Sequence, residues 1–284
     1  MAEHQTLKNY SAIKVTADRG VAFVTIDNPP LNILNAALMT DLHDFATAVK
    51  DDETIRVIVL QSADPDFFIP HGDMNFVTDP SSFIELVNLF EGDNGLNPMQ
   101  NLHEQWRALP QVTIAKITGF ARGGGAELAS ALDMRFGAIG KMGLGQMEAL
   151  IGIIPGGGGT VYLPALMSRA RALEVVLGAG LFDAELAERY GWINRALPAD
   201  EIDEFVDSLA YRIAKLVPGV IEAAKAAINA TVGPQTDGLK EENMLLGKLF
   251  SAPIAVTLTL EALKAGAQTR EGELNLETLV SKLQ

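Results

Sequence analysis

The sequence predicts an α/β fold, in which apolar strands alternate with amphipathic helices. Residues 21–26 and 56–61 are apolar runs rich in β-branched side chains, the composition of buried strands. Between them, residues 35–51 repeat apolar side chains at helical spacing. Strands and helices that alternate in this order are typical of the α/β class.

The alternation continues through the middle of the chain and then gives way to helices. Residues 112–118 and 134–139 are predicted strands, and residues 126–132 form a predicted helix between them. Beyond Pro155 the second half is predicted to be mainly helical. Gly and Pro residues separate the helices expected there, which are 169–177, 184–190, 200–216, 219–230 and 239–265.

Length and composition indicate a globular, cytoplasmic protein. A chain of 284 residues with 48% hydrophobic content can bury a sizeable core. It contains no run of about 18 apolar residues, and residues 1–10 are polar, so we expect neither a membrane span nor a secretory signal. The absence of cysteine excludes disulfides and thiolate chemistry and is compatible with a reducing cytosol.

The charge of the chain limits its partners. A formal net charge of −14 repels phosphate backbones, which argues against binding of nucleic acid. A polyanionic coenzyme would have to depend on a local cationic patch.

The most informative segment is Gly119-Phe-Ala-Arg-Gly-Gly-Gly-Ala-Glu-Leu-Ala129. Its three consecutive glycines allow the backbone to approach a ligand closely. The first N–H groups of the following helix have no partner within that helix and attract negative charge. A tight turn between a strand and a helix is the alternative explanation. The segment therefore predicts an anion site beside the acid/base Glu127.

Other motifs occur in the order and spacing of one large family. Asn28-Pro-Pro-Leu-Asn-Ile-Leu34 and Asp66-Phe-Phe-Ile-Pro-His-Gly-Asp73 precede the glycines, and Leu144-Gly-Gln-Met-Glu148 and Ile151-Gly-Ile-Ile-Pro-Gly-Gly-Gly-Gly-Thr160 follow them. With these motifs the chain resembles the crotonase superfamily, the enoyl-CoA hydratases and isomerases, from about Val15 to Pro198. The last glycine run is not a P-loop, because no Lys-Ser/Thr follows it.

The resemblance implies a fold and an assembly. It implies a crotonase-like spiral of β-β-α units in residues 1–198, which carries the acyl-CoA site. Residues 199–284 would form a helical region for oligomerisation and pocket closure, in a homotrimer or a dimer of trimers. The tail from Pro253 to Gln284 departs from the common family ending.

The resemblance also assigns the catalytic groups. The backbone N–H groups of Gly72 and Gly124 would form an oxyanion hole for the thioester oxygen. Glu127 would orient and deprotonate the water that attacks C3, and Glu148 would deliver a proton to C2. The alternatives are a carboxylate that stabilises a helix N-terminus for Glu127 and a solvated loop charge for Glu148. Met147 stands where the family usually has proline.

Substrate contacts are expected from the first acyl-CoA loop and from the glycine run. The expected contact residues are Phe68, Ile69, Pro70, His71, Asp73, Arg122 and Gly123. His71 replaces a small residue of the family, and it is either an acid/base near neutrality or a half-exposed loop histidine with a structural hydrogen bond. Arg122 either contacts a coenzyme phosphate or acyl carboxylate, or forms a structural salt bridge.

The resemblance implies reversible hydration of a 2-enoyl-CoA thioester, because both glutamates of the family's hydratases are present. Coenzyme A would enter as part of the substrate, with no prosthetic group and no metal. Double-bond isomerisation, thioester hydrolysis and hydroxyacyl-CoA cleavage are alternatives within the family. A crotonase-like protein that binds acyl-CoA without turnover is the alternative from another class.

Overall fold

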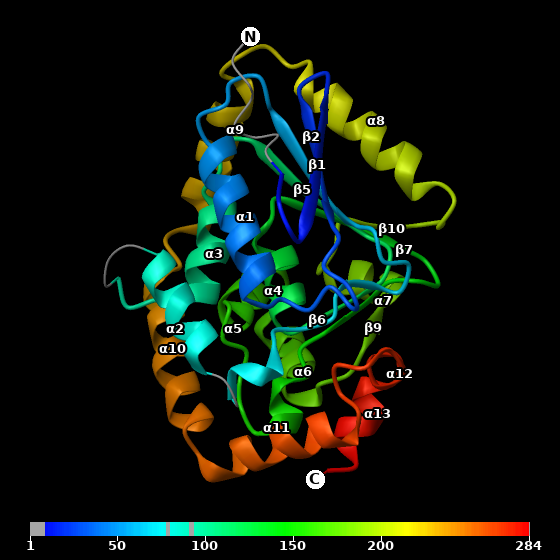
Figure 1. The fold of residues 1–284 in the computed structure, drawn as a ribbon. Coiled ribbons are helices and arrows are strands. Elements are labelled where there is room, and N and C mark those ends of the chain that lie inside the picture. The colour runs from blue at the N-terminus through cyan, green and yellow to red at the C-terminus, as the bar shows by residue number, and fades with distance from the viewer. Residues whose placement is uncertain (1–8, 78–79, 91–93, 284) are drawn as a thin grey trace.

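The fold consists of two β-sheets surrounded by helices. The computed structural model describes residues 9–77, 80–90 and 94–283 (Figure 1). The strands are β1 (Ile13–Asp18), β2 (Val21–Ile26), β3 (Val57–Ser62), β4 (Phe67–Ile69), β5 (Val112–Ile117), β6 (Phe120–Arg122), β7 (Met134–Ala138), β8 (Gly143–Gly145), β9 (Phe182–Asp183) and β10 (Arg195–Leu197).

Helices follow pairs of strands in the first half and dominate the second half. Those up to residue 190 are α1 (Ala36–Val49), the 3₁₀ helix η2 (Met74–Val77), α2 (Pro80–Leu89), α3 (Pro98–Arg107), α4 (Gly124–Ala131), the 3₁₀ helix η3 (Glu148–Ile151), α5 (Gly159–Leu166), α6 (Arg169–Gly178) and α7 (Ala184–Tyr190). The later helices are α8 (Ile202–Ala214), α9 (Val220–Val232), α10 (Thr236–Phe250), α11 (Pro253–Ala265), α12 (Arg270–Leu274) and α13 (Leu276–Ser281).

From β3 to β8, successive strands alternate between the two sheets, so the chain advances as a spiral of β-β-α turns. One sheet has the order β1-β2-β3-β5-β7-β10 and the other the order β4-β6-β8-β9. In each turn after the first, the leading strand (β3, β5 or β7) joins the six-stranded sheet and the next strand (β4, β6 or β8) joins the four-stranded sheet. The pairs β2–β3, β3–β5 and β5–β7 are parallel. The predicted α/β class is confirmed.

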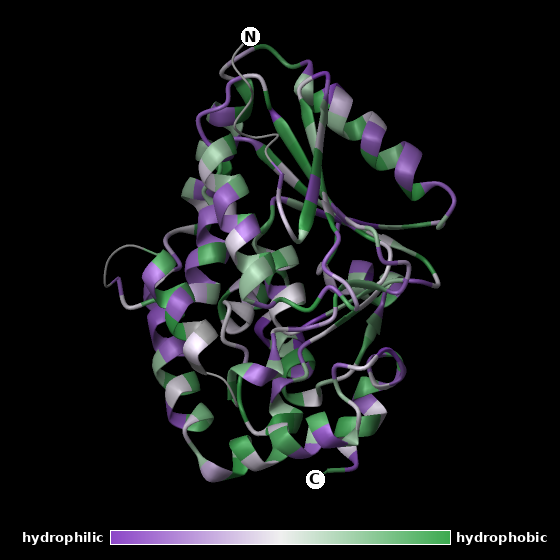
Figure 2. Ribbon diagram, viewed as in Figure 1, coloured by the Kyte–Doolittle hydropathy of each residue, from purple (hydrophilic) through white to green (hydrophobic). Residues whose placement is uncertain are grey.

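Both faces of the six-stranded sheet are buried. On one face Ile58 and Leu60 belong to the main core, which includes residues of α1, α3 and α4. On the other face Val57 and Val59 pack with Val206 and Ala210 of α8, which lies against the sheet in Figure 1. Figure 2 shows the apolar character of the central strands. Burial on both faces explains why the strands read as continuous apolar runs.

The C-terminal helices cover the segment that contains the second glutamate. Leu258 and Ala262 of α11 and Leu276 of α13 pack with Met147 and Ile151, which flank or belong to η3. Because α8 packs on the sheet and α11–α13 pack on η3, residues beyond 198 contribute to the same packed body. The proposed division at residue 198 stays a prediction.

Two expectations from the sequence are corrected. The helix expected over 239–265 is two helices, α10 and α11, which meet at a bend of 78°. The break lies before Pro253, which has no N–H to donate and therefore begins α11 at its first turn. The sequence analysis also omitted β1, although it pairs with β2 along its whole length.

Within the described ranges, no single helix is long and apolar enough to cross a membrane. Only α10 and α11 taken together, despite their bend, pass a test of length and composition.

Arg135 caps the C-terminal end of α4, the helix that follows the glycine run. Its guanidinium is buried and donates to the carbonyl oxygens of Trp192 at 2.8 Å, Leu132 at 2.6 Å and Ala129 at 3.2 Å. We expect Arg135→Met to lower the free energy of unfolding by roughly 2–4 kcal/mol, because it leaves buried carbonyl oxygens without a hydrogen-bond donor. Denaturant unfolding measures this, with exposed Arg212→Met on α8 as the control. Equal stability of both variants would contradict the capping role.

Candidate active site

Gly72 and Gly124 lie against the same side chain, that of Met99. Gly72 forms a parallel bridge with Leu34, in which Leu34 N–H donates to His71 O at 3.0 Å. This pairing turns the Gly72 N–H away from Leu34. A Cβ on Gly72 would lie 3.1 Å from Met99 Cε, and one on Gly124 3.0 Å from Met99 Sδ, so both glycines face the same side chain.

Neither of the two N–H groups is used in the described part of the chain. Gly124 is the first residue of α4, where an N–H has no partner within its own helix. Among the described residues no hydrogen bond is recorded from the N–H of Gly72 or Gly124. Two unused backbone donors on glycines beside the same side chain are suited to the predicted oxyanion hole.

Close packing explains the glycines before Glu127. A Cβ on Gly125 would lie only 2.1 Å from the carbonyl oxygen of Ile69, at the end of β4. Gly123 has a φ of 46°, in the left-handed region that favours glycine. These residues let α4 begin directly against the strand that leads to Gly72. The oxyanion geometry therefore depends on the absence of side chains.

Glu127 lies in the first turn of α4 and is only 1% exposed. Its Oε1 atom accepts hydrogen bonds from the N–H groups of Gly157 at 2.7 Å and Gly159 at 2.8 Å. Burial, followed by repulsion from Glu148 and Glu242, raises the pKa of Glu127, and the two N–H groups oppose that rise. Glu127 is thus an oriented, buried carboxyl group with its other oxygen, Oε2, available for a ligand.

Glu148 begins η3 and lies against Gly123, in the glycine run before Glu127. Its Oε1 atom is 2.6 Å from the position that a Cβ on Gly123 would occupy. The residue keeps some exposed surface, but protein atoms closely surround the carboxyl group. This burial raises its pKa to about 7. With its amide nitrogen turned toward Glu148, Gln146 donates to both carboxyl oxygens at 3.0 and 3.2 Å.

His71 is buried, with 4% of its surface exposed, so the expectation of a half-exposed loop histidine was wrong. Its Nδ1 is 2.7 Å from Gly72 O and its Nε2 is 2.9 Å from Glu273 Oε1. A carbonyl and a carboxylate only accept, so an imidazolium satisfies both contacts. Burial alone lowers the pKa of His71, but the charge and hydrogen bond of Glu273 outweigh this and raise it. An acid/base role stays a prediction, since both ring nitrogens are engaged.

Arg122 forms the structural salt bridge that was one of its two expected roles. The side chain is fully buried, and Nη2 donates to Glu273 O at 3.0 Å and to Glu277 Oε2 at 3.1 Å. Its Nε also donates to Glu277. The guanidinium thereby joins β6 to α12 and α13. A contact with a coenzyme phosphate or an acyl carboxylate stays a prediction.

The remaining predicted substrate residues lie around the Gly72 loop. Phe68 and Ile69 are fully buried in β4, and Pro70 is buried after them. The carboxylate of Asp73 accepts from Gln268 Nε2 at 2.8 Å, which ties the loop to the segment before α12. Substrate contacts of Phe68, Ile69, Pro70, Asp73 and Gly123 stay predictions.

Two side chains beside this site were not predicted from the sequence. Met99 covers Gly72 and Gly124, and Glu242 of α10 reaches the Gly156–Gly159 loop. Gln146, a member of the Leu144–Glu148 motif, reaches Glu148. Met99 and Glu242 belong to helices without a recognisable motif, so no local signal points to them.

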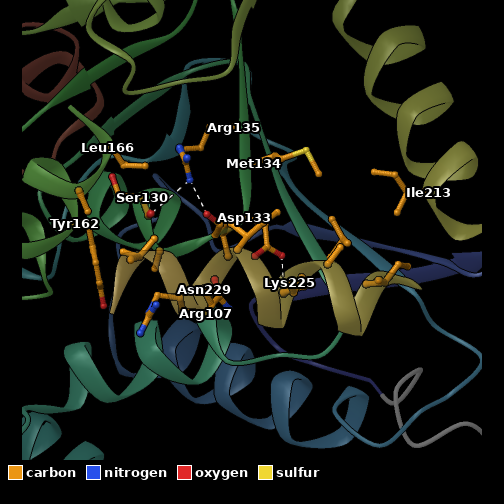
Figure 3. A pocket seen from close by; sticks show the side chains of 18 of the residues that line it. Arg107, Ser130, Asp133, Met134, Arg135, Tyr162, Leu166, Ile213, Lys225 and Asn229 are labelled. Atoms are coloured by element: carbon orange, nitrogen blue, oxygen red, sulfur yellow. Dashed lines mark hydrogen bonds and ion pairs between the residues drawn. The ribbon is translucent and has the colours of Figure 1, made fainter. Parts of the chain in front are cut away.

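A separate open pocket of about 530 Å³ lies beneath α9. Figure 3 shows its lining, in which Lys225 of α9 extends to Asp133, with Nζ and Oδ2 2.7 Å apart. Neither the two oxyanion glycines nor Glu127 and Glu148 line this pocket. It is therefore distinct from the candidate active site.

The pKa of Glu148 predicts a pH-dependent stability. A carboxyl group whose pKa rises on folding, here from 4.5 to about 7, stabilises the fold while it is protonated and ceases to do so as the pH rises through that range. Glu148→Gln stays neutral throughout. Relative to the parent, we expect the variant to gain roughly 2–3 kcal/mol of unfolding free energy between about pH 4 and pH 8.

Denaturant titrations at several pH values measure this difference. The control is Glu188→Gln, because Glu188 is exposed on α7. If the difference in unfolding free energy between the parent and Glu148→Gln stayed constant across this pH range, burial would not raise the pKa of Glu148.

Comparisons with known proteins agree with this geometry. The family model for enoyl-CoA hydratase/isomerase matches residues 16–255. A probable enoyl-CoA hydratase of Mycobacterium bovis is 30% identical over 247 residues, 85% of this chain and 91% of that protein. A crotonyl-CoA hydratase of Syntrophomonas wolfei is 29% identical over 229 residues, 80% of this chain and 84% of that protein.

A solved structure supports the same assignment. The crystal structure of a candidate enoyl-CoA hydratase from Streptomyces avermitilis has a TM-score of 0.93 and 49% sequence identity, over 97% of this chain and 99% of that one. Its similarity extends through the C-terminal helices as well as the spiral. The chain therefore belongs to the enoyl-CoA hydratase/isomerase family of the crotonase superfamily.

Proposed function

We propose that the protein is an enoyl-CoA hydratase that adds water reversibly across the 2,3 double bond of a 2-enoyl-CoA thioester. The observation that carries the proposal is that two buried carboxyl groups meet the glycine run of Gly124: Glu127 lies in the first turn of the helix that Gly124 begins, and Glu148 Oε1 lies 2.6 Å from the position of a Cβ on Gly123. The names of the M. bovis and S. wolfei relatives support it.

Hydration needs an electron sink and two proton transfers. The N–H groups of Gly72 and Gly124 would bind the thioester oxygen as it gains negative charge. The Leu34 N–H polarises the peptide group that contains the Gly72 N–H, through its bond to His71 O. The enolate that forms when oxygen attacks C3 is thereby stabilised.

The two glutamates would divide the proton transfers. Glu127 accepts two N–H groups at one oxygen, which favours its ionised form and suits it to take a proton from water. Glu148, with a pKa of about 7, can hold a proton near neutral pH and give it to C2. The hydroxyl of water ends on C3 and the proton of Glu148 ends on C2. The proton that Glu127 takes from water replaces it, so the pair holds one proton before and after the reaction.

Coenzyme A would enter as part of the substrate, and the reaction as written needs no prosthetic group. The substrate's acyl chain length is not part of the proposal.

The test is hydration of short, medium and aromatic 2-enoyl-CoA thioesters, followed by loss of the conjugated absorbance. We expect turnover in the parent and a fall in kcat of roughly 10²–10⁴-fold in Glu127→Gln and in Glu148→Gln, because each removes a proton-transfer group. Exposed Glu188→Gln on α7 should behave as the parent.

Labelled water separates hydration from the other reactions of the family. Entry of solvent oxygen at C3 is expected for hydration. Label in a released carboxylate would instead indicate thioester hydrolysis, and a shifted double bond without label would indicate isomerisation. Binding of acyl-CoA without any product would replace the proposal by a non-catalytic role.

We further propose that the protein forms a homotrimer or a dimer of trimers through its C-terminal helices. Large apolar side chains are exposed on α9, α10 and α11, among them Ile228, Phe250 and Ile254. Such clusters mark association surfaces. Sedimentation velocity should give three or six times the mass of 30.4 kDa, and Ile254→Glu should reduce it. A monomer in the parent would overturn the assembly proposed.

A further inference from the structure

The Gly157–Thr160 loop is held between two buried carboxyl groups on opposite sides. The N–H groups of Gly157 and Gly159 donate to Glu127 Oε1, at 2.7 and 2.8 Å. Those of Gly158 and Thr160 donate to Glu242 Oε1 and Oε2, at 2.7 and 2.8 Å. Successive N–H groups thus alternate between Glu127 of α4 and Glu242 of α10.

All the hydrogen-bonding partners of the Glu242 carboxyl group are donors, so both of its oxygens must accept. Besides the two backbone N–H groups, Oε1 accepts from Gln100 Nε2 at 3.1 Å and Oε2 accepts from the Thr160 hydroxyl. The Gln100 amide cannot turn round, because its Oε1 accepts from Asn97 N–H and its Nε2 donates to Leu239 O. Glu242 is 2% exposed. A carboxylate is the side-chain group that can accept at both oxygens.

The directions of the N–H groups in this loop depend on both carboxyl groups. Residues 156–159 are all glycine and have no side chains to fix their conformation. Gly158 has a φ of 107°, in the left-handed region. If Gly158 and Thr160 were released, the N–H groups of Gly157 and Gly159 would no longer be directed at Glu127.

We propose that Glu242 is a positioning residue for the reaction: by holding Gly158 and Thr160, it aims the Gly157 and Gly159 N–H groups at Glu127 and so orients the carboxylate that activates water. The inference rests on the proposed hydratase function. Glu242 lies in the helical region beyond the family's motifs and acts on the water through the loop and Glu127.

Glu242 also contributes charge to the site. The titratable groups near it are Glu127 on α4, Glu148 on η3 and His103 on α3. Burial lowers the pKa of His103 to about 4, so this residue is neutral near pH 7. The negative charge of Glu242 raises the pKa of both Glu127 and Glu148, after the larger effect of burial.

The experiment compares Glu242→Gln with Glu241→Gln. Glu241 is the preceding residue of α10 and is exposed, so the two variants make the same charge change. For 2-enoyl-CoA hydration, we expect Glu242→Gln to lower kcat by roughly 10–100-fold with KM within about twofold, and to move the pH–rate profile to lower pH. Glu241→Gln should match the parent in kcat, in KM and in the pH–rate profile.

Two further variants test the route of the effect. In the Glu127→Gln background, Glu242→Gln should cause little additional loss, because both act through one carboxylate. Thr160→Val removes one hydroxyl donor to Glu242 and keeps the backbone N–H, so a threefold or larger fall in kcat is expected even if Glu242→Gln does not fold. Unchanged kcat in Thr160→Val or in folded Glu242→Gln, or fully additive losses with Glu127→Gln, would overturn the proposal.

Amide hydrogen exchange tests the same contact without a substrate. Exchange at Gly157 and Gly159 should be at least tenfold faster in Glu242→Gln than in Glu241→Gln. If the parent hydrates no thioester but exchange behaves as expected, the hydratase function fails and the contact between Glu242 and the loop stands. If the parent is active but exchange is unchanged, the positioning role fails alone.

Discussion

The site depends on the compensation of buried negative charge by backbone N–H groups. Three buried carboxyl groups lie near one another: Glu148 and Glu242 raise the pKa of Glu127, and Glu242 raises that of Glu148. Burial of an unpaired carboxylate is costly. Here the donors come from glycine-rich backbone, with Gly157 and Gly159 on Glu127 and Gly158 on Glu242. Glycine is required because a Cβ at Gly157 would lie 2.7 Å from Glu127 Oε2.

The C-terminal helices hold both halves of this site in place. On one side Glu242 of α10 supports the loop that binds Glu127. On the other side Glu273 of α12 contacts His71, whose ring also contacts Gly72 O. These contacts join elements that are more than 80 residues apart in sequence. The helical region therefore helps to hold the candidate site, whatever its role in assembly.

The central strands and, through the family resemblance, the spiral were predictable from the sequence, whereas the side chains that support the candidate site were not. Strand β2 has the predicted bounds, since a strand buried on both faces is a continuous apolar run. Three-residue strands such as β6 and β8 escaped prediction, because Gly143–Gly145 has neither length nor side-chain periodicity. The role of Glu242 was not predicted, because its partner Gly158 lies 84 residues away and nothing in the sequence of α10 marks Glu242 as buried.

The unequal surroundings of the two glutamates decide how they can divide the reaction. Burial raises the pKa of both, and the charge of Glu148 further raises that of Glu127, so the pair favours one proton and one charge. Two N–H groups point at Glu127, whereas Glu148 contacts Gln146 and keeps some exposed surface. The two N–H donors favour the charge on Glu127, against burial and the charges of Glu148 and Glu242, which raise the pKa of Glu127 well above its ordinary value. The proposed division of roles requires the N–H groups to prevail, so that Glu127 is the base for water and Glu148 the acid for C2.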